Sequence, residues 1–367
     1  MFQMDTVHGV RAMQNGFSKV KGMEFPRNVI IGHGVLDQIV PLSGQLNFLK
    51  EGMIITGRST YASAGKAVEG YMNDGGYDVS VHYTDAATVS NVDRAIDDAK
   101  AAGAKFILGV GGGTKIDISK LVAANLGIPF VSIPTTASHD GIASGRASLK
   151  LDMGPKSIDA TTPMAIVADT AVIAEAPYRH LASGCADVIS NLTALMDWAY
   201  AHRLKAESFS SSAYSLSLHA ANTIMDSAEL IKPGVEDSIW LALRPIIISG
   251  ISMSVAGSSR PTSGSEHMFS HALDVMHKGK AMHGEQCGVG TIMMMYLHGG
   301  DWKSIRTALS EIGAPVDAEG LGISDEDVIE ALMTAHEIRK DRFTILGDKG
   351  LNRESAENVA RKTLVID

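Results

Sequence analysis

The feature that most constrains the fold is a regular alternation, between residues 28 and 169, of short β-branched runs with amphipathic stretches. NVIIG precedes GVLDQIV, GMIITG precedes a helical pattern from Ala62 to Tyr71, and DVSVHY precedes VDRAIDDAKAAG. KFILGV and PFVSIP continue the series, and a segment with Gly and Pro over 147–162 predicts a hairpin or loop before a last strand, MAIVAD. Such alternation is typical of a Rossmann-like parallel sheet covered by helices.

The second half of the chain has a different pattern. After Pro177 the strand signal ends, and segments such as ADVISNLTALMDWAYAHRL show helical spacing. A chain of 367 residues also exceeds what one hydrophobic core usually supports. We therefore expect an α/β domain over 1–176 and an all-helical domain over 177–367, with a hinge at 174–178.

Charge and composition limit the partners. The net charge of -9 argues against binding to nucleic acid or to an anionic membrane surface. The apolar run from Pro245 to Gly257 is too short to span a bilayer and predicts a buried helix. The N-terminal segment has no signal-peptide core, so we expect it to be retained, and two cysteines suggest reduced thiols in a cytoplasmic protein.

A glycine-rich turn follows the KFILGV strand. Gly111, Gly112 and Gly113 lie between that strand and an amphipathic helix. Glycines there let backbone amides approach an anion, and the helix N-terminus favours a diphosphate, although a tight turn that lacks room for side chains explains the same pattern. A second cluster, with Thr135, Thr136 and Ser138, follows the next strand, at the edge where open α/β sheets bind ligands.

Three residues of the second half form a candidate metal site. Asp187 offers a carboxylate, and His267 and His283 offer imidazoles, which leaves a coordination position free on zinc and also suits iron or nickel. His267 and His271 are spaced i, i+4 after a plausible helix start, and His283 precedes another helix. Asp187 itself is expected near the start of its helix, where an isolated Asp usually interacts with the helix dipole. Cys287 is a weaker candidate ligand, because a small buried Cys explains it better.

These motifs resemble a known family. GGGTKIDISK matches the cofactor-phosphate motif of the iron-containing, or metal-dependent, alcohol dehydrogenase superfamily, which includes dehydroquinate synthase. Together with TTASHDGIAS, GCADVISN, SEHMFSHALD and HGEQCGVG, it resembles the archaeal-type sn-glycerol-1-phosphate dehydrogenases over essentially the whole chain. The resemblance implies a dehydroquinate synthase-like fold and reversible reduction of dihydroxyacetone phosphate by NADH or NADPH, for ether-lipid synthesis.

The resemblance also implies roles for particular residues. One zinc ion is bound by Asp187, His267 and His283, and the substrate contacts Asp140, Asp187 and His271. His271 is the first candidate to relay a proton to the product alkoxide, with Asp140 second. The nicotinamide cofactor is bound by residues of the two glycine- and threonine-rich segments: Gly111, Gly112, Gly113, Thr114, Lys115, Ile116, Asp117, Thr135, Thr136, Ala137, Ser138 and Ser144.

One departure from the related glycerol dehydrogenases bears on cofactor choice. Where they commonly have an acidic residue for the adenosine ribose, this chain has Gly57 and Arg58. Arg58 is therefore expected to pair with a 2′-phosphate, so that NADPH is accepted alongside NADH. Lys150, Lys156 and Arg260 are basic residues near the motifs, but each is equally explained as a solvated surface charge, so the substrate phosphate has no assigned site.

Three alternatives remain open from the sequence. A glycerol dehydrogenase acting on the unphosphorylated polyol differs in its kinetics with glycerol and glycerol 1-phosphate. A lyase of the dehydroquinate synthase type consumes no NADH at steady state, because it regenerates its cofactor. A binding protein that lost its chemistry has no need of an open metal position. Apolar helical surface also suggests a homo-oligomer, without locating its interface.

Overall fold

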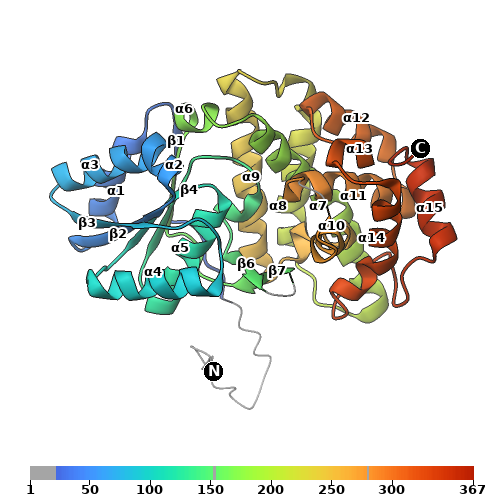
Figure 1. The fold of residues 1–367 in the computed structure, drawn as a ribbon, viewed down its shortest axis with the longest axis horizontal. Helices are drawn as coiled ribbons and strands as arrows, with labels where there is room; N and C mark the ends of the chain where they lie inside the picture. The colour runs from blue at the N-terminus through green and yellow to red at the C-terminus, as the bar shows by residue number, and fades with distance from the viewer. Residues whose placement is uncertain (1–21, 152–153, 279–280) are drawn as a thin grey trace, which may run out of the picture.

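The protein is described by a computed structural model that covers residues 22–151, 154–278 and 281–367. Its two parts lie side by side along the longest axis, the α/β part at one end and the helical part at the other (Figure 1). The N-terminal segment expected to be retained lies outside the described residues. The domain boundary at 176/177 stays a prediction, although every strand ends by Asp169 and the long helices begin at Arg179.

The α/β part contains the expected parallel sheet. Its six strands are ordered β1-β8-β5-β4-β2-β3, and each neighbouring pair is parallel. β4 and β5 are buried along their whole length, as is typical of strands covered on both faces. The strands are β1 (Asn28–Gly32), β2 (Glu51–Thr56), β3 (Asp78–Tyr83), β4 (Ile107–Gly111), β5 (Phe130–Pro134) and β8 (Ala165–Asp169).

Alternate side chains of the strands face two helical layers. Ile54 packs on one face with residues of α1 (Ile39–Gln45) and α3 (Lys66–Asp74), whereas Met53 and Ile55 pack on the other with residues of α4 (Val89–Ala101) and α5 (Gly113–Leu126). Short helical turns complete this part: η1 (Leu36–Gln38), α2 (Arg58–Thr60), η2 (Tyr61–Gly65), η3 (Asp140–Ile142) and α6 (Thr170–Ala174).

The segment over 147–162 forms the hairpin that its composition allowed. Strands β6 (Arg146–Leu151) and β7 (Gly154–Asp159) pair antiparallel and form a separate two-stranded sheet. Residues of β7 lie against helix α10 (Ser265–Val275), so the hairpin connects the two parts of the molecule.

The second part is helical throughout its described residues, as predicted. Helix α7 begins at Arg179, so Asp187 lies in its third turn, and the expected position near the start of the helix is wrong. The alternative role of Asp187 as a partner of the helix dipole is thereby removed. The remaining elements are α8 (Ser211–Asp226), η4 (Ala228–Leu230), α9 (Glu236–Ala256), η5 (Arg260–Thr262), α11 (His283–Leu297), α12 (Trp302–Ile312), α13 (Ala318–Leu321), α14 (Asp325–Ile338) and α15 (Arg353–Lys362), while α7 ends at Lys205.

Helix α9 contains the apolar run from Pro245 to Gly257 almost entirely. Among the described residues it alone is long and apolar enough to cross a membrane, but 61% of its most apolar window is buried inside the protein. It packs against α7 and α8 in the hydrophobic core. The prediction of a buried core helix is confirmed.

Candidate functional site

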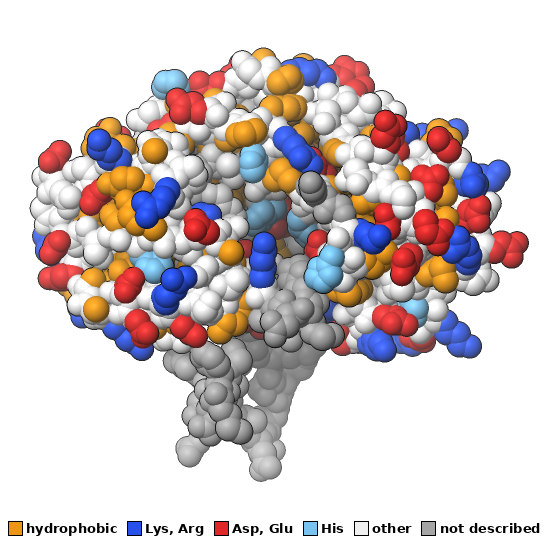
Figure 2. Space-filling model, viewed as in Figure 1, with side chains coloured by type: hydrophobic (Ala, Val, Ile, Leu, Met, Phe, Trp, Pro, Cys, Tyr) orange, Lys and Arg blue, Asp and Glu red, His pale blue; other side chains and the backbone are white. Residues whose placement is uncertain are grey.

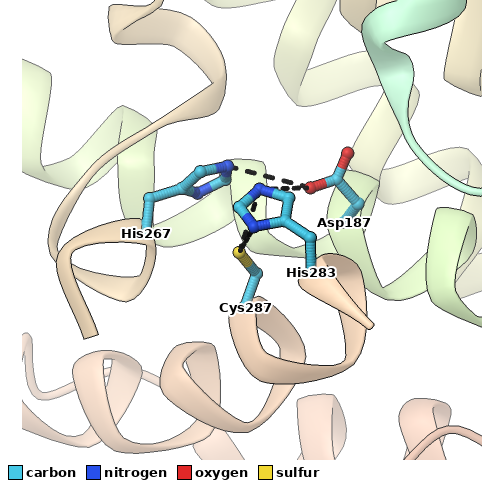
Figure 3. A group of neighbouring side chains, drawn as sticks. All are labelled: Asp187, His267, His283 and Cys287. Carbon is cyan, nitrogen blue, oxygen red and sulfur yellow. Dashed lines mark hydrogen bonds and ion pairs between the residues drawn. The ribbon is translucent and has the colours of Figure 1, made fainter. Parts of the chain in front are cut away.

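The three predicted metal ligands come together from three helices. Asp187 lies on α7, His267 on α10 and His283 at the first position of α11. The Nε2 atoms of His267 and His283 lie 3.7 Å and 3.8 Å from Oδ1 of Asp187 (Figure 3). One ligand atom from each of these residues and from Cys287 lies within 4.8 Å of the others. Histidine side chains are visible in the central hollow between the two parts (Figure 2).

Neighbouring polar groups aim both imidazoles at this point. Nδ1 of His267 lies 2.9 Å from Oε1 of Glu266, a fully buried side chain. Oε1 also accepts from the Gly264 amide, and Oε2 accepts from the Thr193 hydroxyl. Nδ1 of His283 lies 3.1 Å from Oγ of Ser270, whose hydroxyl donates to Gln286. With each Nδ1 bonded in this way, Nε2 is left free for a cation, as in carboxylate–histidine–metal arrangements.

The electrostatics of these groups suit a cation. Burial, and then the neighbouring histidines, lower the pKa of His267 well below its usual value, and burial followed by His271 lowers the pKa of His283 to about 3. Both imidazoles are therefore neutral near pH 7. Burial raises the pKa of Asp187 to about 7, and its Oδ1 is buried without a hydrogen-bond partner. An unpaired carboxylate oxygen facing two neutral imidazoles fits a divalent metal ion.

Cys287 lies closer to this point than its sequence pattern indicated. Its Sγ is 3.6 Å from Nε2 of His283, one helical turn away. Burial is the main cause that raises the pKa of this thiol well above its usual range. The thiol is thus a neutral neighbour of the three ligands in the absence of a cation, which agrees with a small buried Cys.

Glycines let the helices that build the site approach closely. A Cβ at Gly284 would collide with the backbone oxygen of Ser183, and one at Gly184 would collide with that of Ala137. A Cβ at Gly250 would lie 2.5 Å from the backbone carbonyl oxygen of Asp140. These glycines were missed at the sequence level, because close packing between distant helices leaves no local pattern.

The triple-glycine turn is a second candidate ligand site, and side chains of Lys115, Thr136 and His139 pack closely against its three glycines. Gly111 has a φ of 155°, which favours glycine, and Gly112 precedes the first residue of α5 in extended conformation. The Thr136 hydroxyl lies beside Gly112, and the Thr135 amide donates to the Gly111 carbonyl. Both threonine hydroxyls are buried and have no hydrogen-bond partner among the described residues. Unpaired hydroxyls and a side-chain-free helix N-terminus fit the phosphates of a dinucleotide.

Two consecutive residues, His139 and Asp140, connect this turn to the metal ligands. The ring of His139 occupies the space in which Gly113 would carry a Cβ. The next amide, that of Asp140, donates to Oδ2 of Asp187 over 3.1 Å. The predicted cofactor segment and the predicted metal ligand are therefore direct neighbours.

Two predicted cofactor residues turn their side chains away from the turn. Ile116 packs in the core beside the sheet. Asp117 is buried, with Oδ1 3.3 Å from the amine of Lys120 and Oδ2 3.1 Å from the amide of Ser148. Lys120 is fully buried and also donates to the carbonyl oxygens of Gly141 and Arg146. These side chains fix the loop that carries Asp140.

The candidate proton donors border the metal ligands. The ring of His271 stacks on that of His283 at 5.5 Å, and its Nδ1 lies 3.5 Å from Asp274. Oδ2 of Asp140 accepts a hydrogen bond from Ser249, and burial, followed by the charge of Asp187, raises the pKa of Asp140 to about 7. Ser144, expected at the cofactor, is buried near Arg146, with its hydroxyl 3.4 Å from that carbonyl.

Arg58 is the exposed first residue of α2, which follows strand β2. Its guanidinium carbon is 5.3 Å from the centre of the Tyr83 ring. A Cβ at Gly57 would lie 2.7 Å from Cε of Lys115, whose amine donates to the Asp85 carbonyl. The absence of a side chain at Gly57 therefore makes room for the positively charged side chain of Lys115.

The fold is shared with solved dehydrogenase structures. A probable glycerol dehydrogenase from Sinorhizobium meliloti aligns with a TM-score of 0.77 and 18% identity, over 94% of this chain and 98% of that one. The glycerol dehydrogenase from Schizosaccharomyces pombe aligns with a TM-score of 0.79 and 18% identity, over 94% and 91% of the two chains. The family model for iron-containing alcohol dehydrogenases matches residues 30–177. The likeness to these structures shows the fold, and the family model shows similarity to iron-containing alcohol dehydrogenases over the α/β part.

Curated relatives narrow the class. A glycerol-1-phosphate dehydrogenase [NAD(P)+] of Methanococcoides burtonii is 48% identical over 363 residues, 99% of this chain and all of the relative. One from Methanothermobacter thermautotrophicus is 51% identical over 344 residues, 94% of this chain and 99% of the relative. The chain belongs to the glycerol-1-phosphate dehydrogenase family.

Proposed function

We propose that this chain catalyses the reversible reduction of dihydroxyacetone phosphate to sn-glycerol 1-phosphate by NADH or NADPH. The observation that carries the proposal is the convergence of Asp187, His267 and His283 beside the glycine turn. The Asp140 amide bonds to Asp187, and the preceding side chain, His139, packs on the turn. Near-full-length relatives at about 50% identity carry the glycerol-1-phosphate dehydrogenase name. The product would supply the backbone of ether lipids.

The cation proposed for the site is zinc, held by Asp187, His267 and His283. A carboxylate and two imidazoles suit zinc, and they also accept iron or nickel. Bound there, a divalent cation supplies Lewis-acid polarisation of the ketone, while the dihydronicotinamide supplies the hydride. Glu266 and Ser270 keep both imidazoles in the orientation that this requires.

The remaining step is delivery of a proton to the product oxygen. His271 stacks on His283 and is in part exposed, with 23% of its side chain accessible, so it can exchange protons with solvent. We assign it the relay, directly or through water. Asp140 is the second candidate, because a pKa near 7 lets its carboxyl donate at neutral pH.

The glycine turn and the two threonines are the proposed cofactor site. The backbone of Gly111 to Lys115 and the hydroxyls of Thr135 and Thr136 would hold the phosphates, with Ala137, Ser138 and Ser144 contributing to the same site. Asp117 contributes through the backbone, since both of its carboxylate oxygens are already bonded.

The test is a spectrophotometric assay of the purified protein with dihydroxyacetone phosphate, followed by chiral analysis of the product. His267→Ala and Asp187→Asn should each lower kcat/KM at least about a thousandfold and remove the metal, while NADH binding persists. Full activity in either variant would overturn the metal assignment. Steady oxidation of NADH excludes the lyase, and preference for unphosphorylated dihydroxyacetone would favour the glycerol dehydrogenase.

Arg58 is proposed to select the cofactor. Arg58→Ala should raise the KM for NADPH about tenfold and leave the KM for NADH unchanged, because one charge-assisted contact to the 2′-phosphate is lost. Initial rates with both cofactors check this. An unchanged NADPH preference removes Arg58 from the site.

We also propose a cytoplasmic homo-oligomer that acts on small molecules without nucleic acid or membrane partners. The net charge of -9 supports the absence of an anionic partner. Light scattering on the purified protein would measure its mass, and a monomer would contradict the proposed assembly.

A further inference from the structure

Three arginines gather where helix α10 begins. Arg260 lies in η5, and Arg339 and Arg342 follow helix α14, which packs against α10 (Figure 1). We call Arg260, Arg339 and Arg342 the arginine cluster. The sequence left Arg260 as a possible surface charge, but it is only 3% exposed.

Arg260 has an unused donor inside the protein. Its Nε lies 2.6 Å from Oε1 of Glu207, and its Nη2 donates to the other oxygen of Glu207 and, over 3.0 Å, to the Phe343 carbonyl. Its Nη1 is buried and has no hydrogen-bond partner in the described parts of the chain. A buried unpaired donor is costly, so Nη1 indicates an acceptor that belongs there.

Arg342 is a largely buried cation held by neutral acceptors. Its Nη1 donates to the Ser263 carbonyl over 2.5 Å and its Nη2 to the Ser259 hydroxyl over 3.0 Å. Within the described ranges no carboxylate lies in ion-pair distance of it, whereas Arg339 pairs with Asp341. Burial, and then the charges of Arg339 and Arg260, lower the pKa of Arg342 to about 9.

The cluster therefore carries more positive than negative charge. Three guanidinium groups face two nearby carboxylates, those of Glu207 and Asp341. A dianion would offset this excess and could accept from the free Nη1 of Arg260. Guanidinium groups also bind phosphate oxygens in a bidentate manner, which lysine amines do not.

The cluster lies close to the metal ligands. The Ser263 carbonyl, which accepts from Arg342, lies two residues before helix α10 begins and four residues before His267. A ligand that reached both the cation and the cluster would have a polar oxygen at one end and an anion at the other.

We propose that Arg260, Arg339 and Arg342 bind the phosphate group of the substrate. This inference rests on the proposed function, since it places the phosphate of a molecule whose ketone lies at the metal ligands. It explains how a site with a dehydrogenase's metal ligands selects the phosphorylated ketone over the free one. The selecting residues come from η5 and from the connection between α14 and α15.

The test compares two substrates in one set of variants. In Arg342→Gln, the amide keeps donors for Ser263 and Ser259 but loses the charge. We expect kcat/KM for dihydroxyacetone phosphate to fall about 100-fold, mainly through KM, while the low kcat/KM for unphosphorylated dihydroxyacetone stays within about twofold. Arg339→Gln should show a smaller fall. Arg353→Gln, which removes an exposed arginine of α15, is the control and should change neither substrate.

A direct binding measurement keeps the two proposals separable. Inorganic phosphate should bind the metal-loaded wild type in titration calorimetry, and at least about tenfold more weakly the Arg342→Gln variant, whose circular dichroism should match the wild type. If wild type turns over dihydroxyacetone phosphate and Arg342→Gln keeps its KM, the phosphate site is wrong and the function stands. If wild type lacks turnover but phosphate binding depends on Arg342, the function fails and the anion site stands.

Discussion

At the residue scale, the site depends on side chains that do not themselves touch the proposed cation. Glu266 is fully buried, and its Oε1 lies 2.9 Å from Nδ1 of His267. Burial, and then the charge of Asp197, raise the pKa of Glu266 to about 8. The protein thus keeps an unfavourable buried acid in order to orient one imidazole, a cost that is typical of functional sites.

Glu266→Gln should therefore weaken metal binding without removing a ligand. We expect the dissociation constant to rise about 10- to 100-fold, because the amide replaces one of the two oxygens that hold this arrangement with an NH2 donor. Competition with a chromophoric chelator measures this constant. Glu357→Gln, an exposed substitution on α15, is the control, and equal affinities for Glu266→Gln and wild type would show that Glu266 has no orienting role.

Metal uptake should release protons in a pH-dependent manner. The pKa of Asp187 is raised to about 7, so near pH 6 its carboxyl is protonated and each ion that binds should displace about one proton. The imidazoles have lowered pKa values and release none above pH 6.5. The release should vanish by about pH 8.5, as Asp187 ionises.

The same shift sets the sign of the stability change. Because the folded pKa of Asp187 exceeds its unfolded value, its contribution to the stability of the metal-free protein is present in acid and is lost as the pH rises through about 7.

Calorimetric titrations of the protein with metal, in two buffers with different ionisation enthalpies, measure the number of protons released on metal binding. Release that does not change between pH 6 and 8.5 would contradict the assignment.

At the element scale, helix α5 is tied to the catalytic loop by one buried lysine. The amine of Lys120 contacts the carboxylate of Asp117 and the carbonyl oxygens of Gly141 and Arg146. Burial lowers the pKa of Lys120, and the charge of Asp117 opposes that effect. The D-x-x-K part of the glycine-rich motif thus joins the cofactor helix to the loop that contains Asp140.

Lys120→Met should destabilise the protein strongly. It leaves the Asp117 carboxylate uncompensated and two carbonyl oxygens without their donor, which costs about 3–5 kcal/mol in comparable buried pairs. Urea unfolding measures the loss. Lys66→Met, an exposed change on α3, should be neutral, and Asp117→Asn combined with Lys120→Met should recover part of the stability. A loss below about 1 kcal/mol would show that the lysine is dispensable.

At the scale of the whole molecule, the sequence predicted the elements better than their contacts. The strands and the starts of α10 and α11 followed from local patterns around Gly264 and His283. Glu266 precedes His267 directly in the sequence, but its contact with the His267 imidazole depends on the direction in which its side chain points. The arginine cluster brings together η5 and the segment after α14, which are about 80 residues apart in the sequence. No local spacing in the sequence predicts such a contact.

The two parts of the molecule also share buried apolar surface. One hydrophobic cluster includes Ile142 and Ile166 of the α/β part together with Val188, Ile246 and Ile292 of the helices. The alternation that predicts the sheet and the periodicity that predicts the helices are each local. Neither pattern indicates that the two would pack into a common core around the site.

The step from His139 to Asp140 has a consequence for the order in which ligands load. The His139 ring rests on the glycine turn, and the following amide holds the Asp187 carboxylate. A dinucleotide that shifts this ring must also shift the carboxylate. By reciprocity, whatever free energy the nucleotide adds to cation affinity, the cation adds to nucleotide affinity. Occupancy by one ligand therefore changes the affinity for the other by the same factor, whichever ligand binds first.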